Sequence, residues 1–313
     1  MKPFDFLLSM VLLPVMKRAY TMCFVVSAIL SACSGMESKR LDTSKSGAVA
    51  YVLDNPDIDE ASGLAASSIN KGMLWTHNDS GDQARIFLID SLGRHRMTVH
   101  FDGIDNRDWE DIAVGPGPEE AKSYVYIGDI GDNFGRHQHK YIYRVEEPVL
   151  MNERIHVGEV DVITFSLPDG ARDSEALMID PRTKDIYIFT KREKAVNLYR
   201  LPFPQSTAES IVAELVLEGV PLTRVVGADW SSDGSAMLVK TYRRIHYYPL
   251  GDTILFQELL NPNPVRLPYA REPQGESIAF ARNNKGYYTL GERPRGHKAE
   301  LVFYNLDLGG ENQ

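Results

Sequence analysis

The stretch Glu110-Asp-Ile-Ala-Val returns in modified form along the chain, and this repetition decides the fold. Its four counterparts share a run of small and apolar residues after the first position: Ser62-Gly-Leu-Ala-Ala, Glu175-Ala-Leu-Met-Ile, Val226-Gly-Ala-Asp-Trp and Glu276-Ser-Ile-Ala-Phe. Consecutive copies begin 48 to 65 residues apart. A recurring spacing of this size is typical of repeat architectures, in which every unit contributes the same group of secondary-structure elements.

Each copy is followed by two more apolar and aromatic runs, which are separated by polar turns. After Glu110 these runs are Tyr124–Ile127 and Tyr141–Val145. Short β-branched and aromatic runs between Gly, Asp, Asn and Pro turns indicate strands, and no long helical period follows residue 33. The sequence therefore predicts an all-β fold, a β-propeller of five blades.

Six blades are the alternative to five, and one N-terminal segment is a candidate for the strand that closes the ring. A sixth blade would need an irregular unit in the longer second interval or in residues 261–274. The last unit ends after its third run, at Leu306. We expect Val49–Leu53 to supply the missing fourth strand, because an open ring would expose a long strand edge. A two-sheet sandwich would not explain why one pattern returns five times.

The N-terminal region resembles a bacterial lipoprotein signal. Both cysteines lie within the first 33 residues, so the remaining chain can form neither a disulfide nor a zinc–thiolate site. The apolar run that ends at Cys33 is too short for a stable membrane span but long enough for a signal peptide. Leu30-Ser-Ala-Cys33 is similar to the lipobox, which implies that Cys33 is lipidated. A plain N-terminal membrane helix is the alternative.

This resemblance divides the chain into three parts. We expect a signal peptide at 1–32, for which Met16 is an alternative start, then a flexible tether at 33–47 and a single propeller domain at 48–308. Ser34 after the lipidated cysteine favours export to the outer membrane in a bacterium with two membranes. The protein would then reside in the cell envelope, anchored to a membrane through Cys33.

The amino-acid composition limits the classes of ligand that we expect the protein to bind. The chain of 313 residues is 43% hydrophobic and 25% charged, as in an ordinary globular protein, and has a formal net charge of −9. Nucleic-acid binders neutralise phosphates with Lys and Arg, so the acidic balance argues against that class. The net negative charge suits a site that binds a cation. We also expect a small anionic substrate and a monomeric protein.

The candidate site follows from propeller geometry. The start of the first strand and the end of the second strand emerge on the same face of every blade. The first-strand positions are Ser62, Glu110, Glu175, Val226 and Glu276, and the second-strand positions are Asp79, Asp129, Lys191, Lys240 and Glu292. Glutamates that meet on one axis repel each other unless a cation lies among them, and oxygen donors suit Ca²⁺. Alternatively, each glutamate accepts a hydrogen bond from a backbone amide of the next blade.

This order of residues resembles the soluble calcium-activated nucleotidase (apyrase) family, a five-bladed propeller with Ca²⁺ at its centre. The resemblance implies that the calcium ligands are Ser62, Glu110, Glu175 and Glu276. Val226 departs from the family pattern, which has a serine at that position. The resemblance also implies hydrolysis of nucleoside di- or triphosphates or similar phosphoanhydrides.

In such a reaction each candidate residue would have a defined role. Lys191, Arg192 and Lys240 would neutralise the charge that builds on the transferred phosphoryl group. Asp79 or Asp129 would position or deprotonate the attacking water.

Two other classes of function share the central metal. One is a non-catalytic propeller that recognises a ligand or protein and holds a structural calcium, and the other is a calcium-dependent lactonase or esterase. Lysines that point into the axial mouth would favour an anionic substrate, whereas lysines held in salt bridges would favour recognition.

Overall fold

The computed structural model describes residues 41, 43–44, 46–251, 256–261, 264–293 and 298–308. The expected signal peptide at 1–32, the lipidation site Cys33 and the first part of the expected tether lie outside the described residues. The described part of the tether includes Leu41, whose amide donates to Glu300 Oε2 at 2.9 Å. No helix in the described part of the chain has the length and apolarity to cross a membrane.

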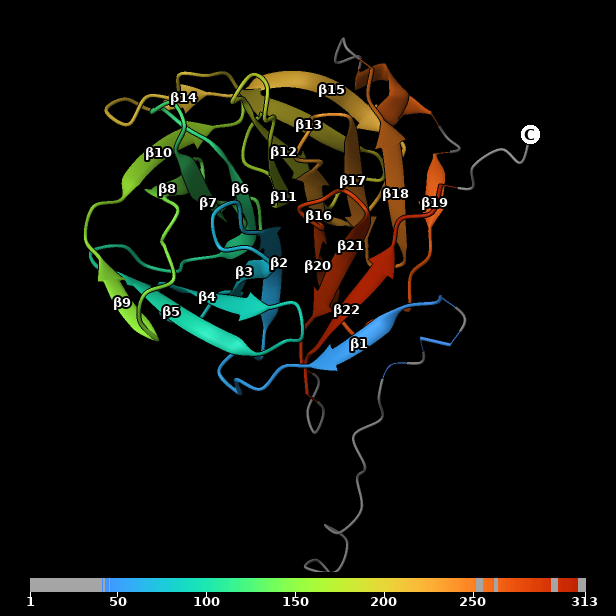
Figure 1. Ribbon diagram of the computed structural model, residues 1–313. Coiled ribbons are helices and arrows are strands. Elements are labelled where there is room, and N and C mark those ends of the chain that lie inside the picture. Colours follow the sequence, from blue (N-terminus) through green and yellow to red (C-terminus); the bar gives the residue numbers. More distant parts are fainter. Residues whose placement is uncertain are drawn as a thin grey trace, which may run out of the picture. The chain divides into compact units, whose positions relative to one another are not determined.

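Five separate sheets surround a common centre, as Figure 1 shows. Blade one contains β2 (Ala61–Ala66), β3 (Met73–Asn78), β4 (Arg85–Asp90) and β5 (His95–Phe101). Blade two contains β6 (Trp109–Pro116), β7 (Ser123–Asp129), β8 (Lys140–Glu146) and β10 (Asp161–Ser166). Blade three contains β11 (Ser174–Ile179), β12 (Ile186–Thr190), β13 (Val196–Leu201) and β15 (Glu214–Val220). Blade four contains β16 (Val225–Trp230), β17 (Ala236–Thr241), β18 (Arg244–Pro249) and β19 (Val265–Leu267). Blade five contains β20 (Gly275–Phe280), β21 (Gly286–Gly291), β22 (Glu300–Asn305) and β1 (Val49–Val52).

The N-terminal strand closes the ring, as the sequence predicts. β1 pairs with β22 in antiparallel register, with Val49 opposite Phe303 and Val52 opposite Glu300. Blade five is thus built from both ends of the propeller domain, and the prediction of an all-β propeller with five blades is confirmed.

The two segments that could have held a sixth blade have other roles. The longer second interval contains β9 (Arg154–Val157), which adds a parallel fifth strand to β5 of blade one. The short β14 (Ile211–Val212) extends β10 of blade two in the same way. Residues 261–274 contain β19, the fourth strand of blade four. A 3₁₀ helix, η1 (Phe256–Leu260), precedes β19.

The hydrophobic core is divided among the interfaces between neighbouring blades. Trp75 of blade one packs in one cluster with Val125 of blade two, and Tyr187 of blade three packs with Trp230 of blade four. Blade five contacts blade one through a cluster that includes Leu301 and Phe87. Because each blade buries both faces against its neighbours, stability depends on closure of the whole ring.

Glycines allow the innermost strands to approach each other closely. A Cβ atom on Gly227 of β16 would lie 2.6 Å from the backbone oxygen of Glu276 in β20. A Cβ on Gly63 of β2 would lie 2.7 Å from the backbone nitrogen of Ile112 in β6. Both obstacles are backbone atoms of the next blade, so a side chain at either position requires the blades to separate.

We therefore predict that Gly227→Ala destabilises the protein by about 1–3 kcal/mol, because the backbone of blade five must shift to admit the methyl group. Thermal or urea unfolding measures this loss. The matched control is Gly158→Ala, which meets no atom within 4 Å and should change stability by less than about 0.5 kcal/mol. Equal stability of the two variants would contradict the close approach of the inner strands.

Candidate functional site

A β-bulge at the start of every innermost strand places one residue at the end of the propeller axis where these strands begin, which we call the mouth. The pairing of each first strand with its second strand skips a single residue near its beginning. The skipped residues are Ser62, Glu110, Glu175, Val226 and Glu276. A bulged residue has no directly opposite partner, and its side chain is turned out of the regular alternation of the strand. The five positions that the repeat singles out are therefore structurally equivalent.

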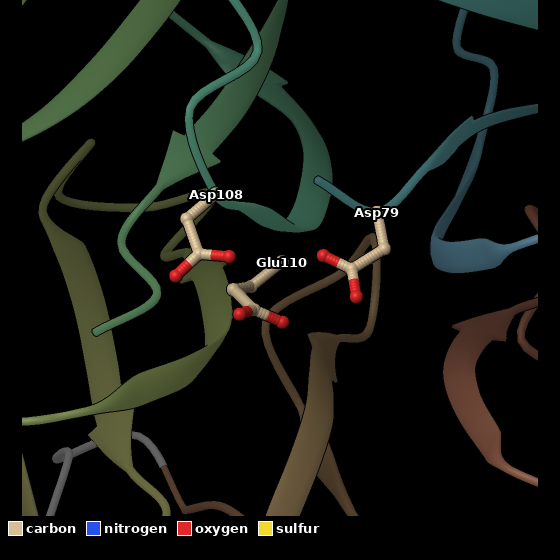
Figure 2. Close-up of side chains that lie close together, drawn as sticks. All are labelled: Asp79, Asp108 and Glu110. Carbon is tan, nitrogen blue, oxygen red and sulfur yellow. The ribbon is translucent and has the colours of Figure 1, made fainter. Parts of the chain in front are cut away.

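Glu110 is the centre of the acidic cluster in the mouth. Figure 2 shows its carboxylate beside those of Asp79 and Asp108, and one oxygen from each residue lies within 4.8 Å of the others. Glu110 is 3% exposed, and no described residue donates a hydrogen bond to its carboxylate. Burial and repulsion by Glu175 and Asp79 raise the pKa of Glu110 well above its ordinary value.

The pKa values of the other two members of this cluster, Asp79 and Asp108, are raised as well. Burial is the main cause that raises the pKa of Asp79 to about 6, and repulsion by Glu276 and Asp108 adds to it. Burial and repulsion by Asp173 raise the pKa of Asp108. Carboxylates that resist ionisation together are those that a divalent cation would stabilise.

A second acidic group in the mouth consists of Glu110, Asp173 and Glu175. Two of its members, Asp173 and Glu175, are paired with Arg192 and Lys191, respectively. Asp173 accepts hydrogen bonds from Arg192 Nε at 2.6 Å and from the backbone amide of Asp132 at 2.8 Å. Because Asp173 and Glu175 have donors, the Asp79–Asp108–Glu110 cluster is the more open of the two to an external cation.

Lys191 crosses the mouth from blade three to blade five. Its Nζ donates to Glu175 Oε1 and lies 3.8 Å from Glu276 Oε1, and Tyr242 donates its hydroxyl to the same Glu276 oxygen. Although burial opposes the charge of Lys191, the carboxylates of Glu175 and Glu276 raise its pKa, so the ammonium stays protonated. Burial nevertheless raises the pKa of Glu175 to about 8.

The remaining predicted residues lie in several environments. Ser62 Oγ donates to the backbone oxygen of Glu110 at 2.7 Å and so links blades one and two. Asp129 is buried and forms an ion pair with Arg107 at 2.7 Å. Lys240 is fully buried, donates to the backbone oxygen of Gly275, and has its pKa lowered by burial to about 8. The roles assigned to these residues stay predictions.

Aspartate side chains on the inner strands accept hydrogen bonds from backbone amides of the next blade. Asp111 Oδ2 accepts from the backbone amide of Leu177 at 2.9 Å, and Asp229 Oδ2 accepts from that of Phe280 at 2.7 Å. The alternative role considered for the glutamates, accepting from backbone amides of the next blade, is thus filled by aspartates elsewhere on the inner strands. This leaves the Glu110 carboxylate available to a ligand.

Sequence reasoning missed Asp108 and Asp173. Each lies two residues before a bulged glutamate, in Asp108-Trp-Glu110 and Asp173-Ser-Glu175. The repeated Asp-x-Glu spacing in blades two and three was the signal that could have found them. Gly131 also belongs to the site, because a Cβ there would collide with Glu110 Oε1 and Asp108 Oδ2.

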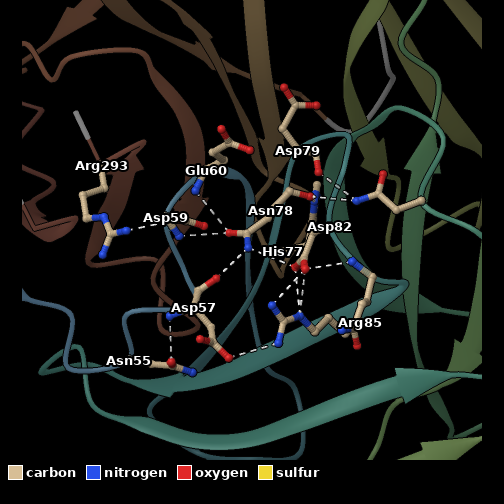
Figure 3. Close-up of polar contacts among 12 residues, drawn as sticks. Asn55, Asp57, Asp59, Glu60, His77, Asn78, Asp79, Asp82, Arg85 and Arg293 are labelled. Atoms are coloured by element: carbon tan, nitrogen blue, oxygen red, sulfur yellow. Dashed lines mark hydrogen bonds and ion pairs between the residues drawn. The ribbon is translucent and has the colours of Figure 1, made fainter. Parts of the chain in front are cut away.

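A half-buried polar network fixes the position of Asp79, as Figure 3 shows. Asn78 Oδ1 accepts from the amide of Glu60 at 3.3 Å, and Asn78 Nδ2 donates to Asp82 Oδ2 at 3.0 Å. Asn106 Nδ2 donates to the backbone oxygen of Asp79 at 2.8 Å. The backbone that carries Asp79 is therefore held between the entry to blade one and the entry to blade two.

Comparison with known proteins adds little to this geometry. No family model and no curated protein matches the chain. The chain is similar to a solved structure of a luciferin-regenerating enzyme, with 11% identity and a TM-score of 0.43, over 84% of this chain and 96% of that one. A similarity of this size carries no conclusion about ligand or activity. The fold assignment rests on the strand pairing itself.

We predict that metal-free protein loses stability as the pH rises from about 5 to 8. The pKa values of Asp79 and Glu175, about 6 and about 8, exceed their ordinary values, so the folded state holds protons that the unfolded state has already released. The free energy of unfolding should therefore fall through this range, by roughly 2 kcal/mol or more. Urea unfolding in the presence of a chelator measures it.

The matched variants are Glu175→Gln, which should flatten this dependence, and Glu120→Gln at an exposed position, which should leave it unchanged. Stability that is constant or rises over this range in the unmodified protein would show that the acidic mouth does not resist ionisation.

Proposed function

We propose that the protein is an envelope-anchored, calcium-binding β-propeller that hydrolyses nucleoside di- or triphosphates or similar phosphoanhydrides at its axial mouth. The observation that carries the proposal is the cluster of the half-buried Asp79 and Asp108 with the buried Glu110, whose carboxylates lie together without an ion-pair partner among the described residues. The anchor is proposed from the leader sequence alone, through Cys33.

The donor set fits Ca²⁺ better than a transition metal. Every candidate ligand is a carboxylate oxygen, which is a hard donor, and Ca²⁺ accepts six to eight such oxygens in flexible geometry. Asp79, Asp108 and Glu110 would hold the ion, and water would complete its coordination. A bound divalent cation supplies Lewis-acid polarisation of a phosphoryl oxygen.

The chain's own residues provide the remaining chemistry. Asp79 would hold the ion and orient the attacking water next to it. Asp129 is less suited because Arg107 already pairs with it. Arg192 is 52% exposed beside the mouth and could neutralise charge on a phosphoryl group, as could Lys191.

The alternative proposal is a non-catalytic propeller that recognises a ligand or a protein partner, with calcium in a structural role. The arrangement of the lysines supports it: Lys191 is held between Glu175 and Glu276, and Lys240 is buried against the backbone of Gly275. Neither ammonium group is free in the mouth. Turnover measurements separate the two proposals.

We predict that calcium-loaded protein releases phosphate from GDP or UDP and that excess chelator abolishes the release. Asp79→Asn should lower kcat by roughly 10²-fold, because it removes a carboxylate that holds the ion and orients the water. Exposed Glu120→Gln is the matched control and should keep full activity. A folded, calcium-loaded protein without turnover would contradict the enzymatic proposal and favour the recognition propeller.

A further inference from the structure

A large basic pocket lies on blade four, next to the acidic mouth. Its volume is about 1070 Å³, at the upper end of the range for small-molecule sites. It is formed by the turn between β17 and β18, by β19, and by the segments that lead into β16 and β20. Tyr242 lines the pocket and donates its hydroxyl to Glu276, so the pocket adjoins the mouth.

Five arginines line this pocket in a protein whose net charge is negative: Arg224, Arg243, Arg244, Arg266 and Arg271. All five are exposed, and none forms an ion pair with a residue in the described part of the chain. Some arginines elsewhere in the propeller have acidic partners, as Arg85 does in Asp82 and Arg144 in Asp161, whereas Arg154, which forms no ion pair with a described residue, does not line this pocket. Like charges gathered without counter-charges point to an anionic ligand.

The acidic residue that lines the pocket does not neutralise these arginines. Glu272 is 4% exposed and accepts hydrogen bonds from Thr289 and from Tyr269, the latter at 3.3 Å. Its remaining electrostatic partner is the buried Lys240. The charge of Glu272 is therefore directed into the protein.

His246 provides a second, independent observation. It lines the pocket, is 4% exposed, and its Nδ1 has no hydrogen-bond partner among the described residues. Burial, together with the charges of Arg266 and Arg244, lowers the pKa of His246 to about 4. The positive charges of these two arginines therefore both reach His246 in the pocket wall. His246 and Arg266 lie opposite each other on the paired strands β18 and β19.

We propose that this pocket binds a ligand bearing two or more phosphate groups, and that it does so without the axial cation. Guanidinium groups form bidentate, charge-assisted hydrogen bonds with phosphate oxygens. Several of them around one concavity fit a ligand with several phosphates better than a single ion. The net negative charge of the protein disfavours a nucleic-acid duplex. A soluble polyphosphate and a phosphorylated lipid headgroup present the same chemistry.

The test is calorimetric titration of the full chain with tripolyphosphate in the presence of a chelator, which removes any contribution from a cation in the mouth. Sedimentation with vesicles of cardiolipin, which carries two phosphate groups, compared with neutral phosphatidylcholine vesicles, forms the second arm. Binding in the first arm identifies a soluble ligand, and binding in the second arm alone identifies a headgroup.

We expect the double variant Arg244→Gln/Arg266→Gln to weaken binding about a hundredfold, by about one order of magnitude per lost charge-assisted contact. Arg271→Gln is a second variant in case the double variant unfolds. Exposed Arg154→Gln, on β9 of blade one, should bind as the unmodified protein does. No binding to either probe, or equal binding by the pocket variants, would overturn the proposal while leaving the axial calcium site untouched.

Discussion

Repulsion among carboxylates in the axial mouth is the constraint on which the proposed function depends. Glu110 lies beside Asp79 and Asp108 on one side and close to Asp173 and Glu175 on the other. A chain gains no stability from burying so many like charges, and at neutral pH their ionisation opposes folding. Lys191 relieves part of the repulsion, at Glu175 and Glu276. A divalent cation at the Glu110 cluster would relieve the rest.

The fold produces this arrangement through a local irregularity repeated five times. In each blade the innermost strand carries a bulge of one residue, which turns that residue toward the mouth. Asp111 and Asp229 hold the inner strands of different blades together by accepting backbone amide bonds. The absence of a side chain at Gly131 leaves room for Glu110 and Asp108. One set of polar groups thus stabilises the architecture, and the Glu110 carboxylate does not belong to that set.

The sequence predicts the architecture well because the repeat is present in every blade. The five copies that begin at the bulged residues determine the number of blades, and the missing fourth strand after Leu306 pointed to Val49–Leu53. The added strands β9 and β14 were not predicted, since each pairs with a blade other than the one that precedes it in sequence. Such pairing depends on where a connecting segment lies in space.

The details of the site were harder to predict than its location. That Glu110 and Glu175 belong to one acidic mouth follows from the equivalence of their positions, whereas the burial of Lys240 depends on its contact with Gly275 in the next blade. The pairing of Asp129 with Arg107 likewise depends on tertiary structure. The basic pocket of blade four was not predicted at all, because its arginines come from four separate segments.

Titration calorimetry of metal-stripped protein with Ca²⁺ near pH 8 is the most direct test of the central claim. The account predicts one calcium site, with affinity lowered tenfold or more in Glu110→Gln and by less in Glu175→Gln, because Lys191 already pairs with Glu175. Absence of calcium binding by the folded, unmodified protein, or equal affinity in Glu110→Gln, would contradict it.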